Sequence, residues 1–167
     1  TEIASRLAKK CGFIVFPTLS YGVSFEHEPL SNISIQSVDY RHFLNGILHS
    51  LWKMSGNLNS VIILNGHHGN LEALDTYLNK YFDPSDGEPK CYSYWHFMKH
   101  EFDHAGFVET SIMLAISDKV KMKKAKKGLI TKGLSEKEIQ RIKKLSTERG
   151  GFPKVAKNGV WGDPTGA

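Results

Sequence analysis

Residues 61–70 read Val-Ile-Ile-Leu-Asn-Gly-His-His-Gly-Asn, a short apolar run that passes directly into a polar turn with two glycines. A run of this length, rich in β-branched residues, predicts a strand that is buried on both faces. Residues 71–82 then repeat apolar side chains at helical spacing, which predicts an amphipathic helix. A strand, a tight turn and a helix in this order form the unit from which parallel sheets are built.

The rest of the chain continues the alternation of helix and strand. Two more strands are predicted, at residues 13–16 (FIVF) and 91–97. Further helices are predicted at residues 3–11, 38–54, 107–116 and 135–148, and the helix at 107–116 is expected to be largely buried because it carries few charges. Residues 83–89 and the tail from Gly150 are predicted to be loops. The pattern indicates the α/β class, with a mostly parallel sheet and helices on both faces.

Composition and charge narrow the class of protein. The 167 residues are 40% hydrophobic and 23% charged, which is typical of a globular domain, and no apolar run approaches the roughly 20 residues of a membrane span. The net charge is +5, but residues 119–127 hold six lysines and no acid, so the remainder carries +5 − 6 = −1. This lysine run predicts a solvated loop or helix face, with an anionic partner as the alternative.

Cys11 and Cys91 are expected to be buried, reduced thiols in the cytoplasm.

The histidines point to a site in the middle of the chain, because all eight lie between His27 and His104. His67 follows the predicted strand at 61–64, and ligands of α/β proteins bind outside the carboxyl ends of parallel strands. Neutral imidazole is a good ligand for Zn, Mn or Fe. The alternative is a plain strand–helix turn that is capped by Asn70 and whose histidines are exposed.

Three other segments carry candidate residues. In residues 103–111 (DHAGFVETS), Glu109 lies in an apolar stretch, where a carboxylate must be paired, protonated or bound to a metal. The alternatives are a helix-start charge for Glu109 and a helix cap for His104. Residues 21–27 (YGVSFEH) also follow a predicted strand. Glu26 and His27 are therefore predicted to line the same site at the strand ends, with an exposed loop as the alternative. Trp95, beside His96 and His100, is either a pocket wall or a core residue.

Four segments taken together resemble one known family. They are YGVSFEH (21–27), NGHHGN (65–70), DHAGFVETS (103–111) and GVWGDPTGA (159–167), and in this order they resemble the creatininase family of creatinine amidohydrolases and related cyclic-amide and formamide hydrolases. The resemblance implies a three-layer α/β/α sandwich with a mostly parallel central sheet. It also implies a divalent-metal site, with two ions (Zn, Mn or Fe) per subunit of the complete protein, and a homohexamer.

The resemblance also implies roles for individual residues. His67 corresponds to a metal-binding histidine, Glu109 to a catalytic or metal-binding acid, and His104 to a proton shuttle. Substrate-binding positions are His27, Tyr21, Trp95, His68 and Asn70. Two departures argue against creatinine as the substrate: Gly69 stands where creatininase has a glutamate ligand, and residues 29–32 read PLSN in place of the usual PGT.

The resemblance leads to an expectation about the domain and its activity. We expect residues 1–167 to be a single creatininase-like domain without the family's N-terminal strand, its metal-ligand loop and its C-terminal helix. The predicted function is metal-dependent hydrolysis of a cyclic amide or formamide C–N bond by activated water, with a small-molecule amide as partner and neither nucleic acid nor membrane. The alternatives are a catalytically incompetent family member with a structural or binding role, and an anion-binding module that uses residues 119–127.

Overall fold

The computed structural model describes residues 1–81, 87–99 and 103–167. These residues fall into two compact units, which are described separately below. The first unit comprises Thr1–Ser24 and Ile33–Phe97, and the second comprises Phe25–Asn32 and Met98–Ala167. Whether residues 1–167 act as a single domain stays a prediction. Among the residues that the structure describes, no helix is both long and apolar enough to cross a membrane.

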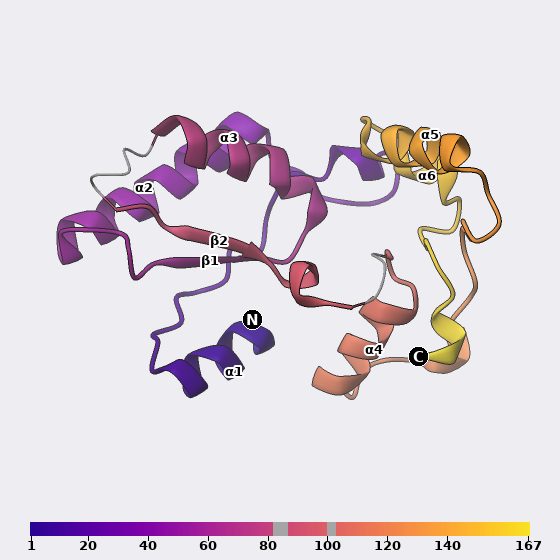
Figure 1. The fold of residues 1–167 in the computed structure, drawn as a ribbon, viewed down its shortest axis with the longest axis horizontal. Coiled ribbons are helices and arrows are strands. Elements are labelled where there is room, and N and C mark those ends of the chain that lie inside the picture. Colours follow the sequence, from indigo (N-terminus) through magenta and orange to yellow (C-terminus); the bar gives the residue numbers. More distant parts are fainter. Residues whose placement is uncertain (82–86, 100–102) are drawn as a thin grey trace. The chain divides into compact units, whose positions relative to one another are not determined.

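The first unit contains a parallel strand pair and three helices (Figure 1). Strand β1 (Ile62–Asn65) pairs in parallel with β2 (Lys90–Ser93), so that Asn65 lies opposite Ser93 at the carboxyl ends of both strands. The helices are α1 (Glu2–Cys11), α2 (Ser37–Ser55) and α3 (Leu71–Tyr81). These elements confirm the α/β class and the predicted parallel pairing.

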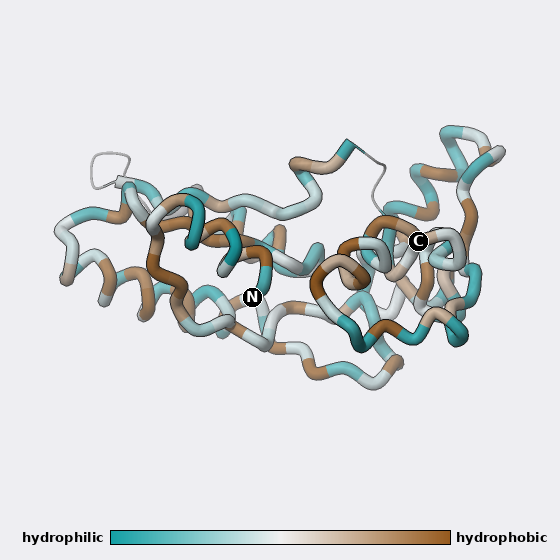
Figure 2. Tube along the Cα trace, turned by 90° about the horizontal axis from the view of Figure 1, so that it is seen from below, coloured by the Kyte–Doolittle hydropathy of each residue, from teal (hydrophilic) through white to brown (hydrophobic). Residues whose placement is uncertain are grey.

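The core of the first unit lies where α2 packs against α3. Tyr40, Leu44 and Leu48 of α2 are buried, and their spacing of four residues places them on one helix face. Tyr77 of α3 is 1% exposed, and its hydroxyl donates to the Asn45 side-chain oxygen at 2.8 Å. Hydrophobic and hydrophilic residues alternate along the helical parts of the trace, as amphipathic helices require (Figure 2).

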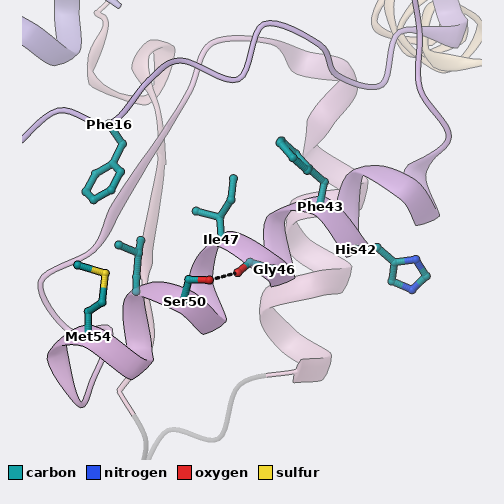
Figure 3. Close-up of a pocket in the computed structure, with 8 residues that line it drawn as sticks. Phe16, His42, Phe43, Gly46, Ile47, Ser50 and Met54 are labelled. Atoms are coloured by element: carbon teal, nitrogen blue, oxygen red, sulfur yellow. Dashed lines mark hydrogen bonds between the residues drawn. The ribbon is translucent and has the colours of Figure 1, made fainter.

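The apolar face predicted for α2 is wider than the face that is buried. Phe43, Trp52 and Met54 are exposed, although the sequence places Phe43 and Trp52 on the predicted apolar stripe. Figure 3 shows the open groove along this helix, which is lined by Phe16, His42, Phe43, Gly46, Ile47, Ser50, Leu51 and Met54.

The strand predicted at residues 13–16 is wrong for this structure. These four residues form no strand, and Ile14 is 87% exposed. A strand needs a hydrogen-bonded neighbour, and no segment among the described residues pairs with this run. The sheet of the described residues therefore has two strands, fewer than the three predicted. The third predicted strand, at 91–97, ends at Ser93 and continues as a 3₁₀ turn, Tyr94–Phe97.

The second unit is built from α4 (Phe107–Ile116), α5 (Glu136–Thr147) and the short α6 (Phe152–Val155). A reciprocal capping box starts α5: the Ser135 hydroxyl accepts from the Glu138 backbone N–H, and the Glu138 carboxylate accepts from the Ser135 N–H. The predicted loop after Gly150 is wrong for α6, which forms because Phe152 is buried beside α5.

The helix at 107–116 forms as predicted, but it is not largely buried. Phe107, Met113 and Leu114 are each at least 40% exposed. The six lysines of residues 119–127 are also exposed, and Met122–Lys124 form only a 3₁₀ turn, which confirms the solvated loop. Cys11 is exposed and Cys91 is half-buried, so the prediction that both thiols are buried is wrong for Cys11. The predicted loop at 83–89 lies partly outside the described residues.

The C-terminal tail pairs with two earlier segments of the second unit. Trp161 forms an antiparallel bridge with His104 and a parallel bridge with Leu129. Gly128 lies against this tail so closely that a Cβ atom there would come within 1.9 Å of the Val160 carbonyl oxygen. Two of the four family-like segments, GVWGDPTGA (159–167) and DHAGFVETS (103–111), are therefore paired with each other.

Candidate active site

Asn65 shapes the turn that carries His67. Its side chain is 3% exposed, and its amide nitrogen donates to the Ser93 hydroxyl at 3.2 Å, across the ends of the two strands. Its amide oxygen accepts from the His67 backbone N–H at 3.1 Å and from the Asn70 side chain at 3.3 Å. Three hydrogen bonds to one buried amide hold His67 at the carboxyl edge of the sheet.

Asn70 links this turn to the segment that contains Tyr21. The Asn70 side-chain oxygen accepts from the Val23 backbone N–H at 2.9 Å. A Cβ atom at Gly22 would come within 2.4 Å of the same oxygen, so glycine is needed for the close approach. Both polar atoms of the Asn70 amide are thus engaged within the protein, whereas Tyr21 is 60% exposed.

His68 and Trp95 form an aromatic wall beside the strand ends. Their rings are stacked, with centroids 5.9 Å apart. Trp95 is half-buried and also meets Tyr94 edge-on at 5.1 Å, while His68 is exposed. An indole face of this kind suits the flat surface of an amide or heterocycle.

In the second unit, Asp103 caps the start of α4. Its two carboxylate oxygens accept from the backbone N–H groups of Val108 at 2.7 Å and Glu109 at 3.2 Å. Asp103 is 9% exposed, and burial raises the pKa of its carboxyl above the ordinary value even though these two hydrogen bonds lower it. The helix start that sequence reasoning considered for His104 and Glu109 is therefore capped by Asp103.

Glu109 folds back onto the turn before its own helix. Its Oε2 atom accepts from the Ala105 backbone N–H at 2.6 Å. Ala105 has a φ of 51°, a left-handed conformation that costs a residue with a Cβ atom roughly 1–2 kcal/mol. The Glu109 hydrogen bond helps to hold this turn. Its carboxylate therefore contacts the residue that directly follows His104 in the chain.

A hydrogen bond fixes the protonation pattern of the His104 ring. The Nδ1 atom lies 2.9 Å from the Gly159 carbonyl oxygen. A carbonyl oxygen accepts only, so Nδ1 must carry the hydrogen, and in the neutral ring Nε2 keeps the lone pair. Backbone hydrogen bonds in both directions with Trp161, at 3.0 and 2.8 Å, hold the residue itself. The position of the His104 ring is therefore fixed by both its side chain and its backbone.

His27 lies beside His104. The two ring centroids are 4.9 Å apart, and the Nε2 atom of His27 is 3.4 Å from the Oε1 atom of Glu26. The side chains of Glu26 and His27 are 14% and 13% exposed, respectively. Two adjacent ligands of a tetrahedral ion with bonds of about 2.1 Å are roughly 3.4 Å apart, so this carboxylate–imidazole pair fits a Zn-like ion.

The predicted site residues divide between the two units. The first unit contains Tyr21, His67, His68, Asn70 and Trp95, and the structure brings His68 and Trp95 together. The second contains His27, His104 and Glu109, and the structure brings His27 and His104 together. The sequence also predicts that His67, His104 and Glu109 meet around a shared cation; this meeting would join residues of different units and stays a prediction. His100 lies outside the described residues.

Sequence reasoning missed the residues that position the candidates. Ser93 was not selected, and Asn65 and Asp103 were treated as parts of motifs without roles of their own. The partnership of Asn65 with Ser93 depends on the strand register, for which the sequence contains no local signal. The capping by Asp103 did have a signal, because an aspartate shortly before an apolar helix is a common cap.

Comparison with known proteins gives two matches. The sequence model of the family described as "Creatininase: Creatinine amidohydrolase" matches residues 1–167. A protein of Mycobacterium ulcerans (strain Agy99) named "Mycofactocin precursor peptide peptidase" is 31% identical over 173 residues, which cover 100% of this chain and 63% of that protein. The chain thus spans less than two thirds of the length of this relative. No solved structure matches significantly.

Proposed function

The chain belongs to the creatininase family, and from this premise we propose that it forms part of a metal-dependent hydrolase that cleaves the C–N bond of an amide with water. The observation that carries the proposal is the hydrogen bond between the His104 ring and the Gly159 carbonyl oxygen. Its Nδ1–H is committed to the Gly159 carbonyl oxygen, which leaves Nε2 as the atom that exchanges a proton. Amide hydrolysis needs such a group, because the leaving nitrogen must be protonated before it departs.

The proposed proton route runs through His104. His104 accepts a proton at Nε2 as water attacks the amide carbon, and it delivers that proton to the leaving nitrogen. The positive charge that forms on the ring is stabilised by the Gly159 carbonyl at Nδ1. His27, whose ring lies 4.9 Å from that of His104 and whose Nε2 atom faces Glu26, is proposed as a substrate contact, as the family resemblance implies.

The donor atoms of the chain suit a divalent ion. We propose His67 and Glu109 as ligands, as the family resemblance implies, in a centre that holds two ions of Zn, Mn or Fe in the complete protein. The hydrogen bond from Ala105 to Glu109 Oε2 is the kind of support that ligating carboxylates receive. When bound, such ions polarise a carbonyl and make water acidic enough to ionise near neutral pH.

Two substrate classes follow from different observations. The family's cyclic-amide and formamide hydrolases favour a small, flat amide, for which the stacked His68 and Trp95 provide a surface, with Tyr21 and Asn70 as further substrate contacts. The name of the M. ulcerans relative favours a peptide bond as the second candidate. Both reactions use the same attack on an amide carbonyl.

We also propose that the protein is a cytoplasmic homohexamer, as in the family.

The proposal is tested with the purified full-length protein. Metal content is measured by mass spectrometry, and hydrolysis is measured with creatinine, a formamide and a short peptide. We expect near-stoichiometric metal and turnover of the formamide or the peptide. His104→Ala is expected to lower kcat by about 100- to 10,000-fold, the usual contribution of general acid–base catalysis. His67→Ala is expected to lower both metal content and turnover.

His49→Ala serves as the matched control, because His49 is an exposed histidine that stacks on Trp52 of the same helix. Its activity and metal content should equal those of the unmodified protein. Metal-free protein without activity toward any of the three substrates would support the alternative of a catalytically incompetent family member. Near-normal turnover by His104→Ala would remove the role assigned to that residue.

A further inference from the structure

We propose that residues Arg149 to Phe152 (RGGF), here called the RGGF segment, are a positioning element that holds His27 and His104 at a fixed separation and tilt. The inference rests on the proposed function, because it concerns His104, the proposed proton-transfer residue, and its neighbour His27, a proposed substrate contact. The RGGF segment joins α5 to α6 in the second unit. None of its side chains is assigned to substrate or metal, so it acts through the histidines.

Phe152 contacts both imidazole rings. Its ring centroid lies 4.8 Å from that of His27, in an edge-on geometry, and 4.5 Å from that of His104. The two imidazoles are 4.9 Å apart, so the three rings form a nearly equilateral triangle. Phe152 is 5% exposed, so its ring is packed against other groups on most sides. The phenyl ring therefore limits how far and in which direction either imidazole tilts.

Arg149 contacts Phe25 and Glu28, which flank Glu26 and His27 in the chain. Its Nη1 atom lies 3.0 and 3.1 Å from the two carboxylate oxygens of Glu28. Its guanidinium carbon lies 4.1 Å from the centre of the Phe25 ring. A planar guanidinium can bind a carboxylate and stack on an aromatic face, which a lysine ammonium does not reproduce.

The backbone of the RGGF segment completes the attachment. The Gly150 N–H donates to the Phe25 carbonyl oxygen at 2.9 Å, from a left-handed φ of 63°. At Gly151, a Cβ atom would come within 1.8 Å of the Leu145 carbonyl oxygen, so the segment passes too close to α5 for any other residue. Side-chain and backbone contacts thus reach Phe25, Glu28 and both histidines from one stretch of four residues.

The experiment uses three variants of the full-length protein. Phe152→Leu removes the ring but keeps an apolar side chain. Arg149→Met removes the charge and the planar guanidinium, whereas Arg149→Lys keeps the charge and one donor nitrogen. The matched controls are Phe13→Leu and Arg141→Met, at an exposed phenylalanine and at an exposed arginine of α5. The readouts are the NMR signals of the His27 and His104 imidazoles, assigned with His27→Gln and His104→Gln, and kcat and KM for the hydrolysed test amide.

We expect the imidazole signals of both histidines to move in Phe152→Leu, because the ring current of the phenyl group is lost. We expect kcat to fall by about 10- to 100-fold, as for misplaced catalytic groups, and any rise in KM from the displaced His27 to be smaller than this fall. Arg149→Met should shift the His27 signals and lower kcat. Arg149→Lys should have a smaller effect in the same direction, because one nitrogen can still bind the Glu28 carboxylate while the planar contact with Phe25 is lost. Both controls should match the unmodified protein.

Unchanged imidazole signals and unchanged kcat in folded Phe152→Leu would overturn the inference. If that variant does not fold, the Arg149 variants decide the question by the same readouts. The NMR signals need no substrate, so a protein that hydrolyses none of the test amides contradicts the proposed function while the positioning role is still measured.

Discussion

The side chains of Asn65 and Ser93 are hydrogen-bonded across the ends of the two parallel strands, with the Asn65 amide nitrogen 3.2 Å from the Ser93 hydroxyl. Both residues are almost fully buried, at 3% and 2% exposed. The bond exists because the strand register places the two residues opposite each other. It couples the strand that leads to His67 with the strand that leads to Trp95, and so aligns the two edges of the candidate site in the first unit.

Replacing either partner should destabilise the protein. Ser93→Ala leaves the buried Asn65 amide without one acceptor, and we expect a loss of about 1–3 kcal/mol in the free energy of unfolding. Asn65→Ala removes the bonds to Ser93, the His67 N–H and Asn70 together, and should cost more. Urea denaturation gives both values. Ser50→Ala, at an exposed serine that bonds within α2, should change little. A smaller loss for Asn65→Ala than for Ser93→Ala would contradict the network.

The role of Glu109 can be separated from its structural bond. Glu109→Gln keeps a side-chain oxygen that can accept from the Ala105 N–H, but it removes the negative charge that a metal ligand needs. We therefore expect thermal stability close to that of the unmodified protein, lower metal content, and a fall in kcat of about 100-fold or more. Elemental analysis and amide hydrolysis by the full-length protein provide the check. Full metal occupancy with normal turnover would show that Glu109 only holds the turn at Ala105.

Local patterns in the sequence predicted the helices and the parallel strands. The helix at 107–116 has the predicted bounds, and the unit from β1 through the NGHHGN turn to α3 forms as expected. These elements depend on the periodicity of consecutive residues and on turn-forming residues, both of which can be read locally. The sequence placed His68 and Trp95 after neighbouring strands, which fits their stacking. His27 was selected as a residue that follows a strand at 13–16, and this strand does not form, so its contact with His104 was not predictable in that way.

The features that sequence reasoning missed depend on partners far along the chain. Residues 13–16 have strand composition, but no described segment pairs with them. Phe43 fits the helical stripe of α2 but faces the open groove, because burial is decided by the neighbouring element and not by the spacing. Phe152 was assigned to a loop, and its contacts with His27 and His104 join residues that lie 48 or more positions apart.

The ionisation of Asp103 should weaken the fold as the pH rises. Burial raises the pKa of this carboxyl above the ordinary value of 3.8, so the folded state favours the neutral form. A raised pKa gives a stabilising contribution that is complete below the unfolded value and is lost as the pH rises through the folded value. The stability of the unmodified protein relative to Asp103→Asn should therefore fall from pH 3 upward. Denaturation of both proteins across this range tests it, and a rising difference would show that the capping hydrogen bonds outweigh burial.

The two cysteines should differ strongly in reactivity. Burial, and then the nearby negative charge of Asp75, raise the pKa of Cys91 to about 11. At pH 8 such a thiol is roughly one part in a thousand thiolate, and the thiolate is the form that reacts. Cys11 is exposed. Iodoacetamide should thus label Cys11 much faster than Cys91, as peptide mass spectrometry of timed samples can show. Cys11→Ser should remove the fast phase, and equal labelling of both residues would contradict the burial of Cys91.

Two glycines should respond to alanine in opposite ways. Gly46 lies inside α2, and a Cβ atom there would have no atom within 4 Å, so Gly46→Ala should stabilise the protein by about 1 kcal/mol through helix propensity. At Gly128, a Cβ atom would collide with the Val160 carbonyl oxygen at 1.9 Å, and this oxygen also accepts the Leu129 N–H. Gly128→Ala must therefore separate the two segments and should cost about 2–4 kcal/mol. Thermal unfolding should show the two melting temperatures moving apart, and a tolerated alanine at Gly128 would mean that the tail does not pair with residues 128–129 in this register.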